Sequence, residues 1–170
     1  MWDRIGHLPD YIISDLNDYY DKRKENFNIV DRGNVKSVRH ISLDAVDDPA
    51  VLECNFELFE LIGNPALTPR ACYILEYYEN SFTNMHIDKV EDSEYDSLTT
   101  VTLLDRSEDL DGGDALFMDN KHENILDNPI TILKQEVGEV VSYSDGELHG
   151  VSKVLRGTRR VLINWWGQDK

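Results

Sequence analysis

Two histidines and one aspartate are the residues whose types and spacing could hold a metal ion. His86 and Asp88 are separated by one residue, and His149 follows 61 positions after Asp88. Residues two apart in a β-strand point to the same face, so the first imidazole and the carboxylate would project together. That tripeptide alone is weak evidence in a chain with 33 acidic residues. With His149, the set matches the triad that binds non-haem Fe(II), and zinc fits less well because no cysteine stands at ligand spacing.

Arg159 is the residue that could bind an organic anion. It begins an expected strand on which it shares a face with apolar residues, namely Val161, Ile163 and Trp165. An arginine among apolar neighbours inside a barrel is costly unless it meets an anion. A planar guanidinium can grip a carboxylate through two parallel hydrogen bonds. On the pattern alone, a solvated surface arginine remains the alternative.

The order and spacing of these residues resemble the Fe(II)- and 2-oxoglutarate-dependent dioxygenases, and within them the prolyl 4-hydroxylase-like branch. The resemblance extends from about Cys72 to Trp166. Its pieces are, in chain order, Tyr77, His86-x-Asp88, Leu103-Leu104-Asp105, Gly112-Gly113-Asp114-Ala115-Leu116-Phe117, Gly138-Glu139-Val140, Leu148-His149-Gly150-Val151, Gly157-Thr158-Arg159 and Trp165. The match is specific because both order and spacing agree.

The resemblance implies that His86, Asp88 and His149 hold iron, with no catalytic residue beyond these ligands. The cofactors would be Fe(II), 2-oxoglutarate as co-substrate and O2, with ascorbate as an expected reductant. In this chemistry 2-oxoglutarate is oxidised to succinate and CO2 while the substrate carbon gains a hydroxyl group. The metal and the co-substrate carry the reaction, and the protein supplies positioning and a dry pocket.

The resemblance also assigns the co-substrate pocket. Arg159 would bind the distal carboxylate of 2-oxoglutarate, Tyr77 would hydrogen-bond the co-substrate or line its pocket, and Trp165 would pack beside it. One branch of prolyl hydroxylases carries a tyrosine on the strand after the first two ligands, where this chain has leucines. The co-substrate would then lack one hydrogen bond or receive it from Thr99 or Thr102.

The elements that must position these residues divide the chain near residue 70. The first part, 1–70, is expected to be a helical support, with helices over about 11–24 and 47–62 and a short strand over 34–43. Apolar spacing predicts the first helix, and Asp48-Pro49 and Gly63-Asn64-Pro65 bound the second. The apolar side of the second helix is expected to carry Val51, Leu52, Phe56, Phe59 and Ile62.

The second part, 71–167, is expected to form the β core. Its eight short strands, separated by turn residues, cover 71–78, 82–88, 98–104, 115–118, 130–133, 139–143, 148–155 and 159–166. Closely spaced short strands favour a sandwich or barrel over βαβ units. We therefore expect a mostly β protein, a cupin-like jelly roll or double-stranded β-helix with N-terminal supporting helices, as one oxygenase domain over residues 1–170.

The net charge of the chain disfavours some classes of binding partner. A net charge of −16 repels phosphate backbones and anionic lipid, so a nucleic-acid-binding or peripheral membrane protein is disfavoured. No apolar stretch is long enough to span a membrane, and no export signal is recognised, which predicts a cytoplasmic protein with unpaired cysteines.

The acidic run after Asp88 is either a solvated loop or a lid over a neutral or basic substrate, with Glu91, Asp92, Glu94 and Tyr95 as lid candidates.

Together these observations predict an iron dioxygenase that hydroxylates an aliphatic carbon, with a prolyl residue of a protein or peptide as the first choice of substrate. Other side chains, free amino acids and nucleobases are the alternative substrates. A non-catalytic β-helix that keeps its metal is the alternative class of protein, and Arg159 speaks against it because a scaffold has no need of an anion-binding arginine inside a barrel. A metal-free jelly roll that binds a sugar or a small acid is the third possibility.

Overall fold

The computed structural model describes residues 1–43, 48–88, 97–119, 124 and 127–168. These residues form two α-helices, one short 3₁₀ helix and eleven strands. The helices are α1 (Asp10–Arg23), η1 (Lys24–Asn26) and α2 (Pro49–Ile62). The strands are β1 (Asp3–His7), β2 (Asn28–Arg32), β3 (Val35–Ser42), β4 (Leu67–Tyr77), β5 (Phe82–His86), β6 (Ser97–Arg106), β7 (Ala115–Met118), β8 (Ile130–Leu133), β9 (Glu139–Ser144), β10 (Leu148–Val151) and β11 (Arg159–Gln168).

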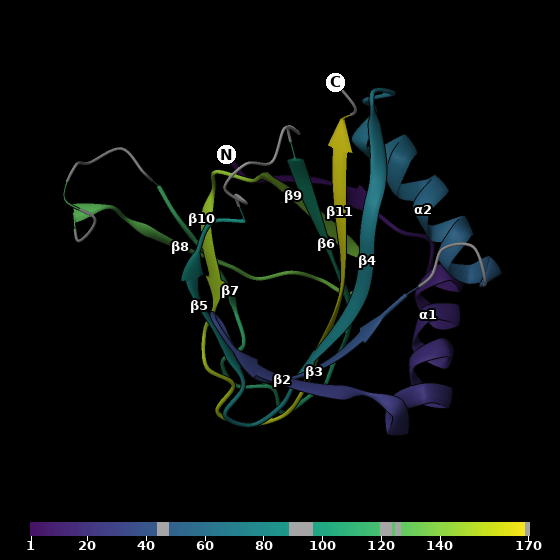
Figure 1. Cartoon of the computed structure of the whole chain (residues 1–170). Helices are drawn as coiled ribbons and strands as arrows, with labels where there is room; N and C mark the ends of the chain where they lie inside the picture. The colour runs from purple at the N-terminus through teal and green to yellow at the C-terminus, as the bar shows by residue number, and fades with distance from the viewer. Residues whose placement is uncertain (44–47, 89–96, 120–123, 125–126, 169–170) are drawn as a thin grey trace.

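The strands join one antiparallel sheet that curls until its two halves face each other (Figure 1). Hydrogen-bonded neighbours follow the order β1-β9-β6-β11-β4-β3-β5-β10-β7-β8, and β2 pairs with β3 beside this path. Strand β3 connects the halves because it pairs with β4 through residues 39–42 and with β5 through residues 35–36. The expected double-stranded β-helix is confirmed.

The eight strands expected after residue 70 correspond to β4 to β11. The largest differences are at β4, which begins at Leu67, four residues earlier than expected, and at β10, which ends at Val151, four residues earlier than expected. The first 70 residues supply three strands as well as the helices, of which only β3 was expected. Strands β1 and β2 expose most of their side chains, so they carry no apolar alternation.

Both helices pack on the outer face of the sheet, beside β4 and β11 (Figure 1). A buried apolar cluster joins helices and sheet and includes Ile12, Leu16, Tyr20, Val51, Leu58, Ile74, Leu104, Leu162 and Trp166. A second cluster lies inside the curl and includes Leu75, Tyr77, Val101, Leu103, Phe117, Val141, Val161 and Ile163. Alternate residues of β11 therefore face the helices or the interior, as predicted.

Helix α2 has the expected ends, and its buried face agrees in part with the expected one. The Asp48 side chain accepts a hydrogen bond from the backbone N–H of Ala50 at 2.9 Å, and Gly63 ends the helix in the left-handed conformation. Leu52 and Phe56, which were expected on the buried side, are 47% and 64% exposed, so that part of the prediction is wrong. Val51 is buried as expected, Phe59 and Ile62 are partly buried against the same core, and the remaining buried positions are Cys54, Asn55 and Leu58.

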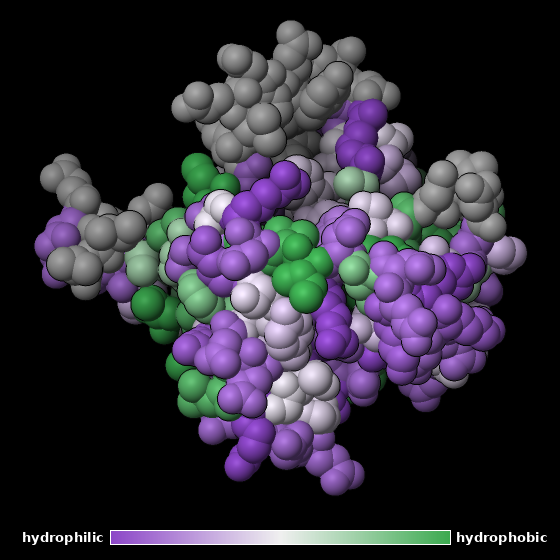
Figure 2. All heavy atoms as spheres, turned by 60° about the horizontal axis from the view of Figure 1, so that its bottom comes forward, coloured by the Kyte–Doolittle hydropathy of each residue, from purple (hydrophilic) through white to green (hydrophobic). Residues whose placement is uncertain are grey.

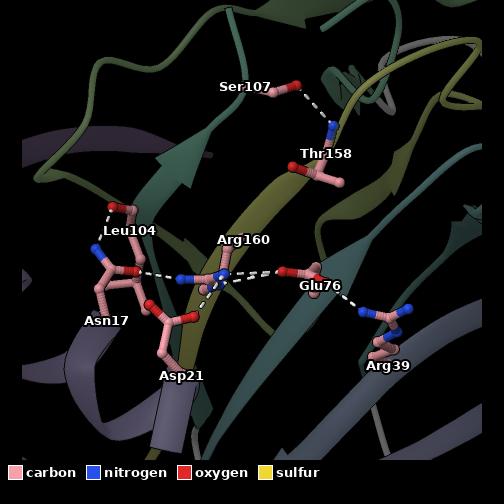
Figure 3. A network of polar contacts seen from close by, with 8 residues as sticks. All are labelled: Asn17, Asp21, Arg39, Glu76, Leu104, Ser107, Thr158 and Arg160. Carbon is pink, nitrogen blue, oxygen red and sulfur yellow. Dashed lines mark hydrogen bonds and ion pairs between the residues drawn. The ribbon is translucent and has the colours of Figure 1, made fainter. Parts of the chain in front are cut away.

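A network of charged residues fastens α1 to the sheet (Figure 3). Buried Glu76 on β4 accepts hydrogen bonds from Arg160 on β11 and from Arg39 on β3, each at 3.0 Å. Arg160 also donates to the Asn17 side chain at 2.7 Å and lies 3.8 Å from a carboxylate oxygen of Asp21, both on α1. The network lies on the helix-facing side of the sheet.

The connections between β4 and β5, β6 and β7, and β10 and β11 gather at the end of the molecule drawn at the bottom of Figure 1. Backbone hydrogen bonds join them, including Ser107 N–H to the Thr158 carbonyl at 3.0 Å. Gly112 and Gly113 have positive φ angles, as expected for this turn. Figure 2 shows that this end is mostly hydrophilic on its surface. Arg159 begins β11 at this end of the sheet.

No helix within the described part of the chain combines the length and apolar character needed to cross a membrane.

Candidate metal centre and adjoining cavity

The three predicted metal ligands come together at the interior face of the sheet. His86 ends β5, Asp88 follows two residues later, and His149 lies opposite His86 in the antiparallel register of β10. Asp88 Oδ1 is 3.3 Å from His86 Nε2 and 3.5 Å from His149 Nε2. The candidate ligand atoms of all three residues lie within 4.8 Å of one another, which suits a shared metal ion.

Hydrogen bonds outside this group hold each ligand in a binding orientation. His86 Nδ1 is 2.8 Å from the Asn84 carbonyl oxygen, and His149 Nδ1 is 2.9 Å from the Glu147 carbonyl oxygen. A carbonyl only accepts, so each Nδ1 carries a proton, and in the neutral form of each ring Nε2 then keeps its lone pair toward the shared point.

The carboxylate of Asp88 is oriented in the same way. Thr99 donates from its hydroxyl to Asp88 Oδ2 at 3.1 Å. This bond leaves Oδ1, the oxygen nearest both imidazoles, as the free donor atom.

The ionisation of the group also suits a metal. Burial disfavours the charge on Asp88, but the hydrogen bond with His86 and the nearby imidazoles lower its pKa below the ordinary value overall. Burial lowers the pKa of His149, so that this imidazole is neutral at pH 7. Burial also opposes a charge on His86, yet its bonds with Asp88 and the Asn84 carbonyl raise its pKa. An ionised Asp88 beside a neutral His149 is the state in which both residues can donate to a metal ion.

The donor set fits Fe(II). Two imidazole nitrogens and one carboxylate oxygen form the facial arrangement typical of non-haem iron, with the other coordination positions left open. Within the described residues, no fourth histidine, cysteine or carboxylate joins the group. A structural zinc site would need such a fourth ligand.

A cavity begins at these ligands and extends between the two halves of the sheet. Its walls are mainly apolar and aromatic, and they include Tyr73, Leu75, Val101, Phe117, Val141, Tyr143, Val161, Ile163 and Trp165. His86, Asp88, His149, Tyr77 and Arg159 line the same cavity. Of these described lining residues, Asp88 is the single acidic one.

Arg159 is a buried cation in this cavity. Arg159 is only 5% exposed, and its guanidinium donates a hydrogen bond from Nη2 to Gln135 Oε1 at 3.0 Å. No ion pair among the described residues involves it, although burial disfavours its charge and lowers its pKa. The alternative of a solvated surface arginine is therefore wrong. A buried guanidinium with a neutral partner fits an anionic ligand.

The structure also places the other predicted co-substrate residues. Tyr77 and Trp165 line the cavity, and the Tyr77 hydroxyl is 2.8 Å from the Thr83 hydroxyl. Thr102 faces the helices beside Leu162, away from the cavity, whereas the Thr99 hydroxyl donates to Asp88, and a hydrogen bond from Thr99 to the co-substrate stays a prediction. The lid candidates Glu91, Asp92, Glu94 and Tyr95 lie outside the described residues.

The sequence analysis did not single out several residues that line the cavity, among them Tyr73, Gln135 and Tyr143. Strand alternation could have found Tyr73, which is four residues before Tyr77 on β4 and shares its face. The same alternation on β9 puts Tyr143 beside the interior residue Val141, and its ring centre is 4.3 Å from that of His149. Gln135 follows β8 in a connection and carried no pattern in the sequence.

Comparison with known families decides what this arrangement is. The model of the 2OG-Fe(II) oxygenase superfamily matches residues 72–168, which is more than half of the chain. The chain belongs to this superfamily. As a 2OG-Fe(II) oxygenase it is a 2-oxoglutarate-dependent dioxygenase, whose chemistry uses Fe(II), 2-oxoglutarate and O2. The resemblance to this family is confirmed.

Solved structures share the fold of this oxygenase. A prolyl-4-hydroxylase from Pseudomonas putida is 21% identical, with a TM-score of 0.80 over 99% of this chain and 93% of that one. A prolyl hydroxylase from Trichoplax adhaerens, solved with a hypoxia inducible factor peptide fragment, is 13% identical, with a TM-score of 0.75 over 99% and 83%. The epimerase SnoN from nogalamycin biosynthesis is 10% identical, with a TM-score of 0.78 over 98% and 76%. No curated protein matches the chain in sequence.

Proposed function

We propose that the oxygenase holds Fe(II) through His86 Nε2, His149 Nε2 and Asp88 Oδ1. Bound iron supplies the oxidising chemistry that attacks a carbon–hydrogen bond. The chain's own part is to keep the three donor atoms facing one point. The carbonyls of Asn84 and Glu147 fix the imidazoles for this purpose.

Arg159 is the proposed partner of the distal carboxylate of 2-oxoglutarate. The single observation that carries the proposal is a buried guanidinium, without a carboxylate partner among the described residues, in the cavity that begins at the metal ligands. A five-carbon diacid has one oxo-acid end for the metal and one carboxylate for the arginine. Tyr77 can keep its bond with Thr83 and still contact the co-substrate, because a tyrosine hydroxyl both donates and accepts. Trp165 forms part of the wall beside it.

A prolyl residue in a neutral or basic peptide is the proposed substrate. Two of the similar structures are prolyl hydroxylases, and one of them was solved with a peptide. The net charge of −16 favours peptides without excess negative charge and disfavours nucleic acid. The apolar and aromatic walls next to the metal ligands suit a pyrrolidine ring.

A small-molecule substrate is the second candidate. The likeness to the epimerase SnoN supports it, since that protein has the same fold and its name describes a reaction other than prolyl hydroxylation. A matched pair of substrates separates the two candidates. Free proline and a blocked proline-containing peptide, each incubated with the enzyme, would be examined by mass spectrometry for the gain of one oxygen atom.

The first experiment tests the cofactor assignment. Fe(II) and 2-oxoglutarate are added to the protein without oxygen, and the weak visible charge-transfer band of the chelate is followed. We expect a band that requires both compounds and is lost in His149→Ala. A folded, iron-loaded protein without the band would contradict the proposal.

Turnover is followed by the release of succinate from 2-oxoglutarate, with and without candidate peptides. Ascorbate as a reductant is tested in the same assay, by whether it prolongs turnover. The cytoplasmic location stays a prediction from the sequence.

A further inference from the structure

Gln135 is a buried amide that contacts Arg159 inside the cavity wall. It is 5% exposed and lies in the connection between β8 and β9. Its Nε2 donates to the Val101 carbonyl at 3.1 Å and to the Glu139 carbonyl at 3.3 Å. These carbonyls only accept, so the amide nitrogen must face them. The amide oxygen is thereby directed at Arg159.

The backbone that carries Gln135 is itself held in place. The Glu139 side chain accepts a hydrogen bond from the backbone N–H of Glu136 at 3.1 Å and forms an ion pair with Arg4 of β1. The backbone N–H of Gly138 donates to the Leu103 carbonyl at 2.8 Å. Gln135 is thus a fixed acceptor rather than an adaptable surface side chain.

The contact leaves most of the guanidinium for a ligand. Gln135 Oε1 accepts a hydrogen bond from one N–H of Arg159, and the guanidinium makes no other hydrogen bond within the described residues. A guanidinium has five N–H donors in a fixed fork, so fixing one of them sets the direction of the rest.

The neutral character of the partner distinguishes Arg159 from the arginine that follows it. Arg160, on the opposite face of β11, contacts the carboxylates of Glu76 and Asp21. Arg159 instead contacts the neutral side-chain amide of Gln135. A carboxylate at position 135 would neutralise the guanidinium and compete with an incoming anion.

We propose that Gln135 is a positioning residue for the co-substrate: it fixes the direction of the Arg159 guanidinium and, being uncharged, leaves its positive charge to the distal carboxylate. The inference rests on the proposed function and deepens it. Gln135 would then set the preference for a dicarboxylic over a monocarboxylic 2-oxo acid without touching the metal.

The test compares Gln135→Met and Gln135→Glu with the natural protein. The probes are 2-oxoglutarate and 2-oxopentanoate, which has the same chain length but no distal carboxylate. Dissociation constants are measured without oxygen, in the presence of Fe(II), by the visible band and by calorimetry. The readout is the ratio of the two constants, so it does not depend on turnover.

We expect Gln135→Met to weaken 2-oxoglutarate binding about tenfold, which is the scale of a lost hydrogen bond to a charged group. Gln135→Glu should weaken it about 100-fold, because its carboxylate competes for the guanidinium. Binding of 2-oxopentanoate and of Fe(II) should stay as in the natural protein. A purely structural role would affect both oxo acids alike.

Asn164→Leu is the matched control. Asn164 is a buried amide on β11 that bonds to Asn55 on the helix side, so its loss should lower stability and leave the ratio unchanged. If the natural protein binds 2-oxoglutarate with iron but both Gln135 variants keep its ratio, the inference is overturned and the proposed function stands. If the natural protein shows no iron-dependent binding of 2-oxoglutarate, the proposed function fails and the inference with it.

Discussion

Replacing Arg159 with methionine should stabilise the ligand-free protein and at the same time remove its response to 2-oxoglutarate. The guanidinium is buried, and its one hydrogen bond among the described residues goes to a neutral amide. Burial lowers the pKa of Arg159, which is the sign of a charge that costs free energy to bury. Methionine has a similar length, is apolar and suits the walls of the cavity.

The expected size follows from these contacts. A buried, unpaired charge lowers the free energy of unfolding by several kcal/mol, and the bond with Gln135 offsets about 1.5–3 kcal/mol of this loss. Arg159→Met should therefore gain about 1–2 kcal/mol, and at about 2–4 °C per kcal/mol for a chain of this size its Tm should rise by about 2–8 °C.

With 2-oxoglutarate bound, the natural protein should become more stable than the Arg159→Met variant. At a 2-oxoglutarate concentration of about 100 times Kd, bound ligand adds about 2.7 kcal/mol to its free energy of unfolding, or about 5–11 °C. With Arg159 as the proposed partner of the distal carboxylate, the variant should lose the charge-assisted bonds to it, so that its Kd rises about 100-fold or more and the same concentration adds less than about 0.5 kcal/mol. The order of the two Tm values should then reverse.

Thermal unfolding with Fe(II), without oxygen, and with or without 2-oxoglutarate measures both effects. The matched control is Arg160→Met, which changes the next residue on the helix-facing side. That variant should lose stability, because Glu76 loses a partner, but it should keep the response to 2-oxoglutarate. The reasoning is refuted if Arg159→Met has a lower Tm than the natural protein without ligand, or if 2-oxoglutarate raises both Tm values equally.

Three further substitutions test other parts of the site and its support. His86→Ala should lose Fe(II) binding with little change in Tm, because the His86 side chain lies at the end of a strand and faces the cavity. Metal content after dialysis measures the loss, and retained iron would contradict the ligand assignment. Thr99→Val removes the donor to Asp88 and should weaken Fe(II) binding about 10–100-fold, measured against a chromophoric chelator; unchanged affinity would mean that the bond does not orient the carboxylate. Glu76→Gln should lower the free energy of unfolding in urea by about 3 kcal/mol, because Arg160 loses its buried partner, while the Kd of 2-oxoglutarate for the folded protein stays the same. A large rise in that Kd would instead place Glu76 in the co-substrate site.

The strands that build the cavity were predictable because one face of each is buried. Apolar alternation and turn residues marked β4 to β11, and only strand ends differed. Strands β1 and β2 could not be found in this way, because their side chains are mostly exposed and their pairing with β9 and β3 depends on the folded sheet. The buried face of α2 was wrong at Leu52 and Phe56, since apolar type alone does not show which side of a helix meets the sheet.

The site was predictable where residue type limits the chemistry. Few kinds of site combine two histidines, an aspartate and an interior arginine, so the order of these residues along the chain was enough to predict a metal site beside an anion-binding group. Gln135 has many roles, and its significance appears only when the fold brings the β8–β9 connection to the start of β11. The directing carbonyls of Asn84 and Glu147 are backbone groups, for which the sequence carries no signal.

The consecutive arginines of β11 connect the stability of the fold to the proposed co-substrate pocket. In the register with β4, Arg160 lies opposite Glu76 and Arg159 lies opposite Tyr77. Side chains alternate along a strand, so a shift of one residue would turn the first arginine toward the helices and the second into the cavity. The ion pair of Arg160 and Glu76, reinforced from α1, opposes such a shift. Helix α1 therefore helps to keep Arg159 in the cavity without lining it. The well-paired burial of Arg160 offsets the unfavourable burial of Arg159.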